Sequence, residues 1–158
     1  MIELGEQSRA SSESQTEMTL MMLPSDANPM GNVFGGTILR HVDLIAGIVA
    51  KRHARNTNCV TASIDRMKFL KPVYIGNALI LAARLNYVRR SSMEIEVLIE
   101  SENLDTGTRE RTGTAFVTVV ALGKDGRPTA VPPLTPQNEE ERRRFLEGEK
   151  RMLARLRE

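Results

Sequence analysis

Two glycines just before a helix-like segment are the first residues that could do chemistry. Gly35 and Gly36 begin a stretch with helical periodicity, so the first N–H groups of that helix would lack intrahelical acceptors. A helix N-terminus of this kind can bind an anion, or the oxyanion that forms when a carbonyl carbon is attacked. The alternative is that the glycine pair only allows a tight turn against a sheet.

Asp43 could act together with this helix start. It follows Gly36 by seven residues, about two helical turns along the same face, and helical side chains lean back toward the N-terminus. A partly desolvated carboxylate beside an oxyanion site could activate water for attack on an acyl carbon. The alternative is an aspartate at the border of the buried face that hydrogen-bonds to a neighbouring strand.

Other catalytic signatures are missing from the sequence. It contains no glycine-rich nucleotide-binding motif, no GxSxG motif and no HExxH motif. His41 and His53 are twelve residues apart on the expected helix, about 18 Å at 1.5 Å per residue, and cannot share a metal. With a single Cys in the chain, we expect no metal site and no prosthetic group. We expect each histidine at the helix surface or in an interface.

The elements that must position these residues are one helix and five strands. Residues 35–53 carry an apolar stripe of helical period and further apolar side chains on another side, which is typical of a buried helix. Alternating or β-branched patterns predict strands at residues 16–23, 59–65, 78–88, 93–101 and 112–122. The strand connections after the helix are too short for crossover helices, so the strands must pair antiparallel. The fold class is therefore α+β.

The chain length of 158 residues favours a single domain. We expect a flexible polar N-terminus at residues 1–15, the domain at 16–136 and a charged helix at 137–158. That helix has only a sparse apolar stripe, at Phe145, Met152, Leu153 and Leu156. It could lie over its own domain, or it could serve as an oligomerisation helix.

Composition excludes several classes of partner. The chain has 22 Lys and Arg against 20 Asp and Glu, a net charge of +2, which is too balanced for a nucleic-acid-binding surface. No uncharged run approaches the roughly 18 apolar residues that span a bilayer. A single Cys forms no intrachain disulfide, and the first twenty residues do not resemble a signal peptide. We expect no membrane partner and a cytoplasmic location.

Several motifs in a fixed order resemble the hotdog-fold acyl-CoA thioesterases. They are PSDANPMGNVFGG at residues 24–36, Val42-Asp43, TASIDRMKF at 61–69 and Arg90-Ser91-Ser92, and the resemblance covers about residues 16–135. It implies the hotdog fold, in which a long central helix is wrapped by an antiparallel sheet. It also implies that two subunits join their sheets edge to edge, with shared active sites at the dimer interface, and that dimers assemble further into hexamers as trimers of dimers.

The resemblance also implies roles for individual residues. Asp43 would be the general base or nucleophile, Asn28 of the opposite subunit would orient water or the thioester, and the Gly36 N–H would bind the oxyanion. Gly35 and the Arg90-Ser91-Ser92 segment would bind the substrate, since a guanidinium and hydroxyls suit the phosphates of coenzyme A. Without the resemblance, the segment Arg89-Arg90-Ser91-Ser92 favours a solvated hairpin turn between two strands.

The implied reaction is hydrolysis of a fatty acyl-CoA thioester to a free carboxylic acid and coenzyme A, with coenzyme A as part of the substrate and not a cofactor. Two alternatives remain open. A hotdog dehydratase usually needs a histidine beside its carboxylate, and the Asn28–Gly36 loop contains none. A non-catalytic acyl-CoA sensor would keep the fold and the ligand site without needing Asp43.

Overall fold

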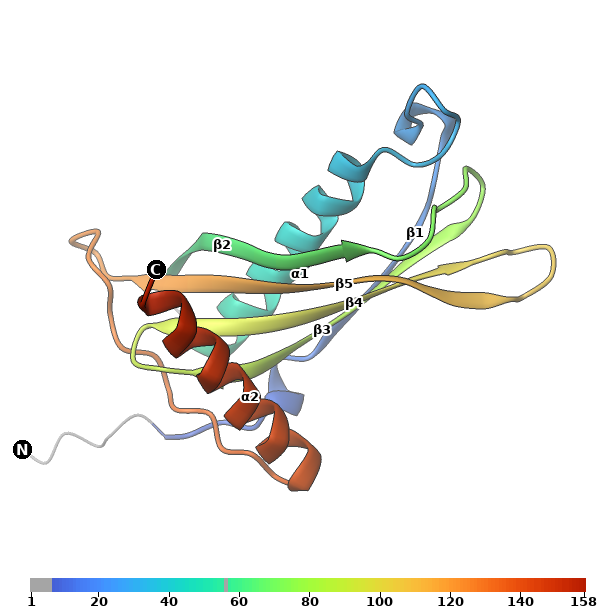
Figure 1. Cartoon of the computed structure of the whole chain (residues 1–158). Coiled ribbons are helices and arrows are strands. Elements are labelled where there is room, and N and C mark those ends of the chain that lie inside the picture. Colours follow the sequence, from blue (N-terminus) through green and yellow to red (C-terminus); the bar gives the residue numbers. More distant parts are fainter. Residues whose placement is uncertain (1–6, 56) are drawn as a thin grey trace, which may run out of the picture.

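A five-stranded antiparallel sheet with one helix on each face forms the body of the molecule (Figure 1). The computed structural model describes residues 7–55 and 57–158. The strand order is β1-β3-β4-β5-β2. The strands are β1 Thr16–Met21, β2 Asn58–Phe69, β3 Ala78–Val88, β4 Ser92–Glu102 and β5 Arg109–Leu122. The five strands and their antiparallel pairing confirm the sequence prediction.

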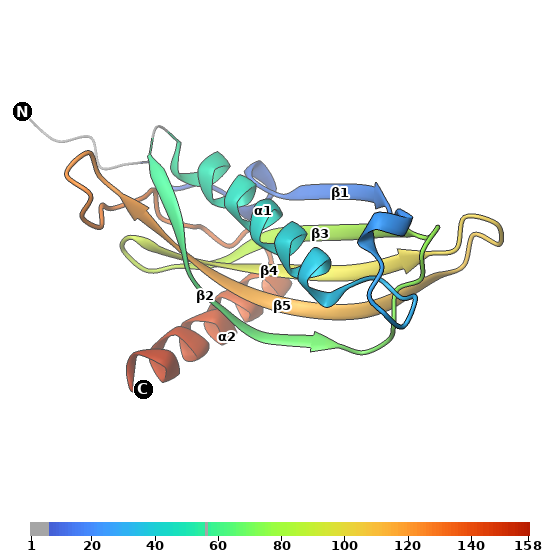
Figure 2. The same cartoon turned by 90° about the horizontal axis from the view of Figure 1, so that it is seen from above.

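The long helix α1, Gly35–Ala54, lies across one face of this sheet, here called the inner face (Figures 1 and 2). Its apolar stripe, including Val42, Ile45 and Val49, is fully buried. Met93, Ile95 and Val97 of β4 belong to the same hydrophobic core. Each such side chain contributes about 1.5–3 kcal/mol by leaving water. The predicted buried helix and its boundaries are thus confirmed.

The second helix α2, Glu139–Leu156, covers the opposite, outer face of the sheet (Figure 1). Its Met152 and Gly148 are buried, and the Phe145 ring meets Tyr87 of β3 edge to face at 4.9 Å between centroids. A Cβ on Gly148 would lie 2.8 Å from the Tyr87 Cβ, so only glycine lets the helix approach this closely. The helix lies over its own domain, as one of the two sequence interpretations had it.

Strands β1 and β2 form the two edges of the sheet, and β2 is irregular. Its pairing with β5 shifts register between Thr61 and Ser63 and again between Asp65 and Lys68. Such bulges re-aim the side chains that follow them. Strict alternation along the strand predicted at residues 59–65 puts Val60, Ala62 and Ile64 on one face. That alternation is wrong, because Ile64 packs against the core whereas Val60 is 46% exposed.

Two further expectations differ from the structure. Residues 9–15 are attached and not loose: the Arg9 N–H donates to the Pro133 carbonyl at 2.9 Å, and the Ser11 hydroxyl donates to the Leu85 carbonyl at 2.8 Å. Residues 1–6 of the predicted flexible N-terminus lie outside the described residues. His53 is 1% exposed, with Nε2 2.6 Å from the Pro132 carbonyl oxygen, so it is a core residue. No helix in the described part of the chain is long and apolar enough to cross a membrane.

Candidate active site

The loop that leads into α1 is shaped by the side chain of Asn28. Its Oδ1 accepts hydrogen bonds from the backbone N–H groups of Met30, at 2.9 Å, and Asn32, at 3.1 Å. This is an Asx-type turn, and Gly31 within it has φ +86°, which favours glycine. Among the described residues, no acceptor is bonded to the Asn28 NH₂ group. Its position can therefore present donors to another molecule.

The first turn of α1 presents unpaired donors. Phe34 precedes the helix in an extended conformation, and its carbonyl accepts from the Thr37 N–H at 3.0 Å. Within residues 7–55 and 57–158, no acceptor is bonded to the N–H groups of Gly35 or Gly36. The helix start is therefore able to bind an oxyanion, as the sequence suggested.

The same glycines also make room for two aromatic rings. A Cβ on Gly36 would overlap the Phe34 ring, and a Cβ on Gly35 would lie 3.5 Å from Cζ of Phe69. Both rings are more than half exposed. The two sequence interpretations of the glycine pair are thus compatible, since the pair allows close packing and leaves the amides open.

Asp43 is held by a residue of the edge strand. Its Oδ1 accepts a hydrogen bond from the Thr61 hydroxyl of β2 at 2.6 Å, and both residues are exposed in the single chain. A short bond between a hydroxyl and a carboxylate fixes the carboxylate firmly. The expected alternative, an aspartate bonded to a neighbouring strand, is therefore present in the structure. The bond occupies Oδ1, and the other carboxylate oxygen can still serve a catalytic role.

The sequence did not predict the role of Thr61, because the alternating pattern gives no sign of the register shift in β2. Thr61 precedes the bulge and reaches Asp43, while Ser63 and Asp65 follow it and contact Arg155 of α2 on the outer face. A strict alternation would have placed Thr61, Ser63 and Asp65 together. The signal that could have found Thr61 is its place in the TASIDRMKF motif.

Arg90-Ser91-Ser92 forms the hairpin turn between β3 and β4. The Arg89 N–H donates to the Ser92 carbonyl at 3.0 Å, the Ser91 carbonyl accepts from Ala121 at 2.9 Å, and the Arg90 carbonyl accepts from Val131 at 3.0 Å. The backbone of the turn is thus fixed, and the Arg90 side chain is exposed. The geometry fits the hairpin interpretation and leaves the guanidinium accessible to a ligand.

The single chain does not bring all the candidate residues together. Gly35 lies beside Phe69, the last residue of β2. Ser92 pairs with Val120 of β5, close to the point where Leu122 pairs with Asn58, the first residue of β2. A strand of that length spans about 40 Å. The Arg90 turn and the start of α1 are therefore at opposite ends of the sheet.

The surface around Asp43 and the start of α1 is apolar and exposed. Phe34, Phe69, Tyr74 and Leu44 are each 49–55% exposed. Large exposed apolar side chains that gather on one side of a molecule mark interaction sites. Within the described residues, no group of three His, Cys, Asp or Glu side chains could hold a metal ion.

An antiparallel sheet wrapped around one long helix, with a carboxylate on that helix and unpaired amides at its start, defines a hotdog-fold protein. A family model of the thioesterase superfamily matches residues 30–108. The chain is 40% identical over 135 residues to an acyl-CoA thioester hydrolase of Bacillus subtilis, YkhA, covering 85% of this chain and 78% of that protein. This chain belongs to the thioesterase superfamily, and the hotdog fold expected from the sequence is confirmed.

Other relatives agree with this assignment. The cytosolic acyl coenzyme A thioester hydrolase of rat is 39% identical over 144 residues, or 90% of this chain; the chain spans only 38% of that relative's length. A hexameric acyl-CoA thioesterase superposes with a TM-score of 0.90 at 40% identity, over 96% of each chain. The acyl-CoA hydrolase of Staphylococcus aureus in complex with butyryl coenzyme A gives a TM-score of 0.85 at 33% identity, over 93% of this chain and 89% of the other.

Proposed function

We propose that this protein hydrolyses fatty acyl-CoA thioesters to a free carboxylic acid and coenzyme A. The proposal rests on the Asp43 carboxylate, which is fixed by the Thr61 hydroxyl of β2. Asp43 lies on α1, the helix that begins with the unpaired N–H groups of Gly35 and Gly36. The names of the relatives support it, since they are acyl-CoA thioester hydrolases. Coenzyme A is part of the substrate, and the proposed reaction uses no cofactor.

In the proposed mechanism Asp43 acts as general base or as nucleophile. As a base it takes a proton from water while the water oxygen bonds to the thioester carbonyl carbon. As a nucleophile its carboxylate oxygen makes that bond itself, and water later releases the acid. In both versions the Gly36 N–H donates to the oxyanion, the C–S bond breaks, and the coenzyme A thiolate takes up a proton. Thr61 is the positioning residue of the carboxylate.

We further propose that two chains build each active site. Asn28 is not bonded to Asp43 within the described chain, and its NH₂ group is open to a partner. A second copy that covers the exposed apolar surface around Leu44 and the start of α1 would supply Asn28 to Asp43. Hexameric relatives support assembly beyond the dimer, and we propose a trimer of dimers.

The Arg90-Ser91-Ser92 turn is the proposed coenzyme A contact, with Gly35 at the acyl end of the substrate. Because one chain keeps the two about a strand length apart, the turn would serve the active site of a neighbouring chain in the assembly. A guanidinium with two hydroxyls suits a phosphate group. A cytoplasmic location is also proposed, supported by the cytosolic relatives.

Release of free thiol from acyl-CoA esters of increasing chain length tests the proposal. The wild-type chain should release coenzyme A from at least one of them. No release from any ester would overturn the hydrolase and favour a non-catalytic acyl-CoA sensor. Addition of water to an enoyl-CoA without thiol release would favour a dehydratase instead.

A further inference from the structure

Two hydroxyl side chains that are two residues apart in β2 face opposite sides of the sheet. The register of β2 against β5 shifts between Thr61 and Ser63, as it does at a β-bulge. On the inner face the Thr61 hydroxyl donates to Asp43 of α1 at 2.6 Å. On the outer face the Ser63 hydroxyl accepts from Nη1 of Arg155 in α2 at 2.5 Å. The two helices therefore hold the same short segment of the strand from its two faces.

The backbone ladder that holds this segment is interrupted. β2 is an edge strand, so in the described chain it pairs with β5 on one side only. Its register shifts between Thr61 and Ser63 and again between Asp65 and Lys68. Within the second irregularity Arg66 has a φ of +52°, a conformation that residues other than glycine rarely adopt. Side-chain contacts must therefore help to fix where Thr61 lies.

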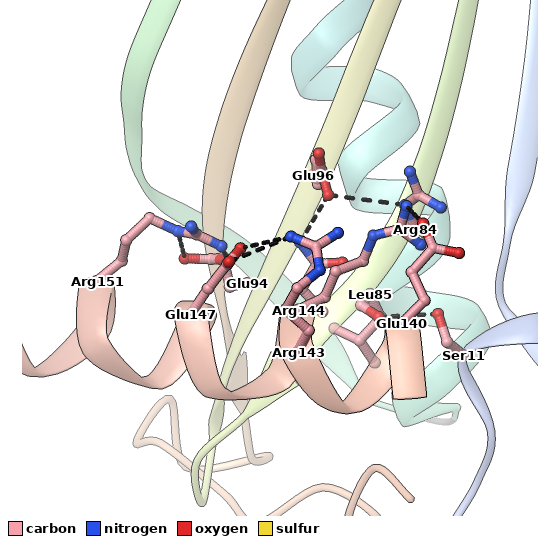
Figure 3. Close-up of polar contacts among 11 residues, drawn as sticks. Ser11, Arg84, Leu85, Glu94, Glu96, Glu140, Arg143, Arg144, Glu147 and Arg151 are labelled. Atoms are coloured by element: carbon pink, nitrogen blue, oxygen red, sulfur yellow. Dashed lines mark hydrogen bonds and ion pairs between the residues drawn. The ribbon is translucent and has the colours of Figure 1, made fainter. Parts of the chain in front are cut away.

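Arg155 approaches β2 from a helix that is fixed on the neighbouring strands. Figure 3 shows Arg151, one turn before Arg155, turned toward Glu94 of β4, and the two hydrogen bonds between Arg151 and Glu94 measure 2.7 and 3.0 Å. The Arg151 guanidinium also lies 3.9 Å from the centre of the Phe116 ring of β5. Met152 is buried, and its sulfur accepts from Nη2 of Arg155 at 3.2 Å. The Arg155 guanidinium is thus held at a defined place beside β2.

The Arg155 guanidinium meets a small polar cluster just after the bulge. Its Nη1 lies 4.0 Å from the Asp65 carboxylate, and that carboxylate accepts from the Ser63 hydroxyl at 2.9 Å. The Arg155 side chain is 24% exposed, so solvent weakens these contacts less than it would at a fully exposed site. The Ser63 hydroxyl accepts one hydrogen bond and donates another, which uses its single donor and fixes its orientation.

We propose that Arg155 is a positioning residue for the hydrolysis: by holding Ser63 on the outer face, it sets where the Thr61 hydroxyl meets Asp43 on the inner face. The inference rests on the proposed function, which gives the Asp43 carboxylate its catalytic role. Arg155 lies on the face of the sheet opposite Asp43 and acts only through β2. The charged helix α2 thereby contributes to the active site without contacting it.

A double-mutant cycle in kcat between Arg155 and Thr61 tests the proposal. Arg155→Gln should lower kcat about threefold with KM unchanged, a smaller loss than that of the Thr61 hydroxyl because Arg155 acts through the strand. In a Thr61→Val background, where the bond to Asp43 is already lost, R155Q should have almost no further effect. Equal losses in the two backgrounds would indicate a general structural role and overturn the proposal, as would full activity of R155Q.

Arg157→Gln is the matched control on the same helix end. It removes the same charge from an exposed position two residues further along the chain, and it should leave kcat unchanged. Ser63→Ala removes the acceptor of Arg155 and should lower kcat about as much as R155Q, with no further loss when the two are combined. A loss in R157Q as large as in R155Q would indicate an effect of charge alone and contradict the proposal.

Amide hydrogen exchange in residues 58–64 of the assembled protein gives a readout that does not depend on hydrolysis. R155Q should speed exchange in this segment, because local opening of the edge strand becomes easier, and R157Q should not. Unchanged exchange and full kcat in R155Q, with an active wild type, would overturn the role of Arg155 alone. A wild type that releases no thiol from any ester would overturn the proposed hydrolysis and, with it, the positioning role.

Discussion

The two faces of the sheet are completed in different ways. On the outer face, α2 of the same chain covers the strands, and Glu94 of β4 is 4% exposed and paired with Arg151 of that helix. On the inner side, α1 is buried along one stripe but leaves Leu44 and Asp43 at the surface beside the edge strand β2. The outer face is covered by a helix of the same chain. The inner side leaves a carboxylate and exposed apolar side chains that a second chain can cover. The outer ion pair should therefore serve stability, and the inner carboxylate activity.

The largest expected effect is on the inner side. Asp43→Asn should lower kcat at least about 100-fold, the scale of losing a positioned base or nucleophile, while the melting temperature stays near that of the wild type. Steady-state kinetics with an acyl-CoA ester measures it. Asp105→Asn, in the exposed turn between β4 and β5, is the control and should keep full activity. Full activity in D43N would refute the assignment.

A substitution in the ion pair of the outer face should lower the free energy of unfolding. Glu94→Gln removes one partner of a buried ion pair and leaves the Arg151 charge without its carboxylate, which costs about 3 kcal/mol of unfolding free energy. Burial lowers the Arg151 pKa and the pair with Glu94 raises it. Because a guanidinium stays protonated in proteins even without such a partner, the variant keeps an uncompensated charge. Urea unfolding at fixed protein concentration gives the value.

Glu100→Gln is the matched control for the outer face. Its partner Arg109 is half exposed, and breaking such a surface pair costs about 0–1 kcal/mol. Equal losses in the two glutamate variants would contradict the contrast between a buried and an exposed pair.

Thr61→Val should have a smaller effect on the inner side. It keeps the shape of the side chain but removes the hydrogen bond to Asp43, and we expect kcat to fall about tenfold, the scale of one bond to a charged group. Thr61→Ser, which keeps the hydroxyl, should recover most of the activity. A serine variant as impaired as the valine variant would argue against positioning through the hydroxyl.

Arg90→Ala should have the smallest effect. If the turn binds a phosphate of coenzyme A, the loss is one of uniform binding, so KM should rise roughly threefold to tenfold with little change in kcat. Arg89→Ala, at the neighbouring exposed position, serves as the comparison. A fall in kcat at constant KM would contradict the proposed coenzyme A contact.

The parts of the fold that follow from local periodicity were predictable from the sequence. The apolar stripe from Ile38 to Val49 predicted α1 almost to its ends, and the alternation from Met93 to Ile99 predicted β4. The register shift in β2 was not predictable, because a one-residue bulge leaves no periodic signal and yet reverses which face the following side chains occupy. His53 was misjudged for a different reason: its burial depends on Pro132, far away in the sequence.

The candidate site was predictable only in part. Gly36 and Asp43 share one helix, so their spacing could be read from the sequence. The separation of Arg90 from Gly35 could not, since it depends on the strand order β3-β4-β5-β2. The attachment of residues 9–15 likewise depends on long-range bonds such as that from Ser11 to Leu85.

The central claim, that each active site is shared between two chains, is tested most directly by mixing two inactive variants. Asp43→Asn and Asn28→Ala chains, co-expressed in equal amounts and purified together without selection for mixed dimers, would place an intact Asp43 opposite an intact Asn28 at one of the two sites of each mixed dimer. Random pairing should then restore about a quarter of the wild-type activity, because half the dimers are mixed and each holds one complete site. Activity no higher than the mean of the two separate variants would contradict the claim and place each site within a single chain.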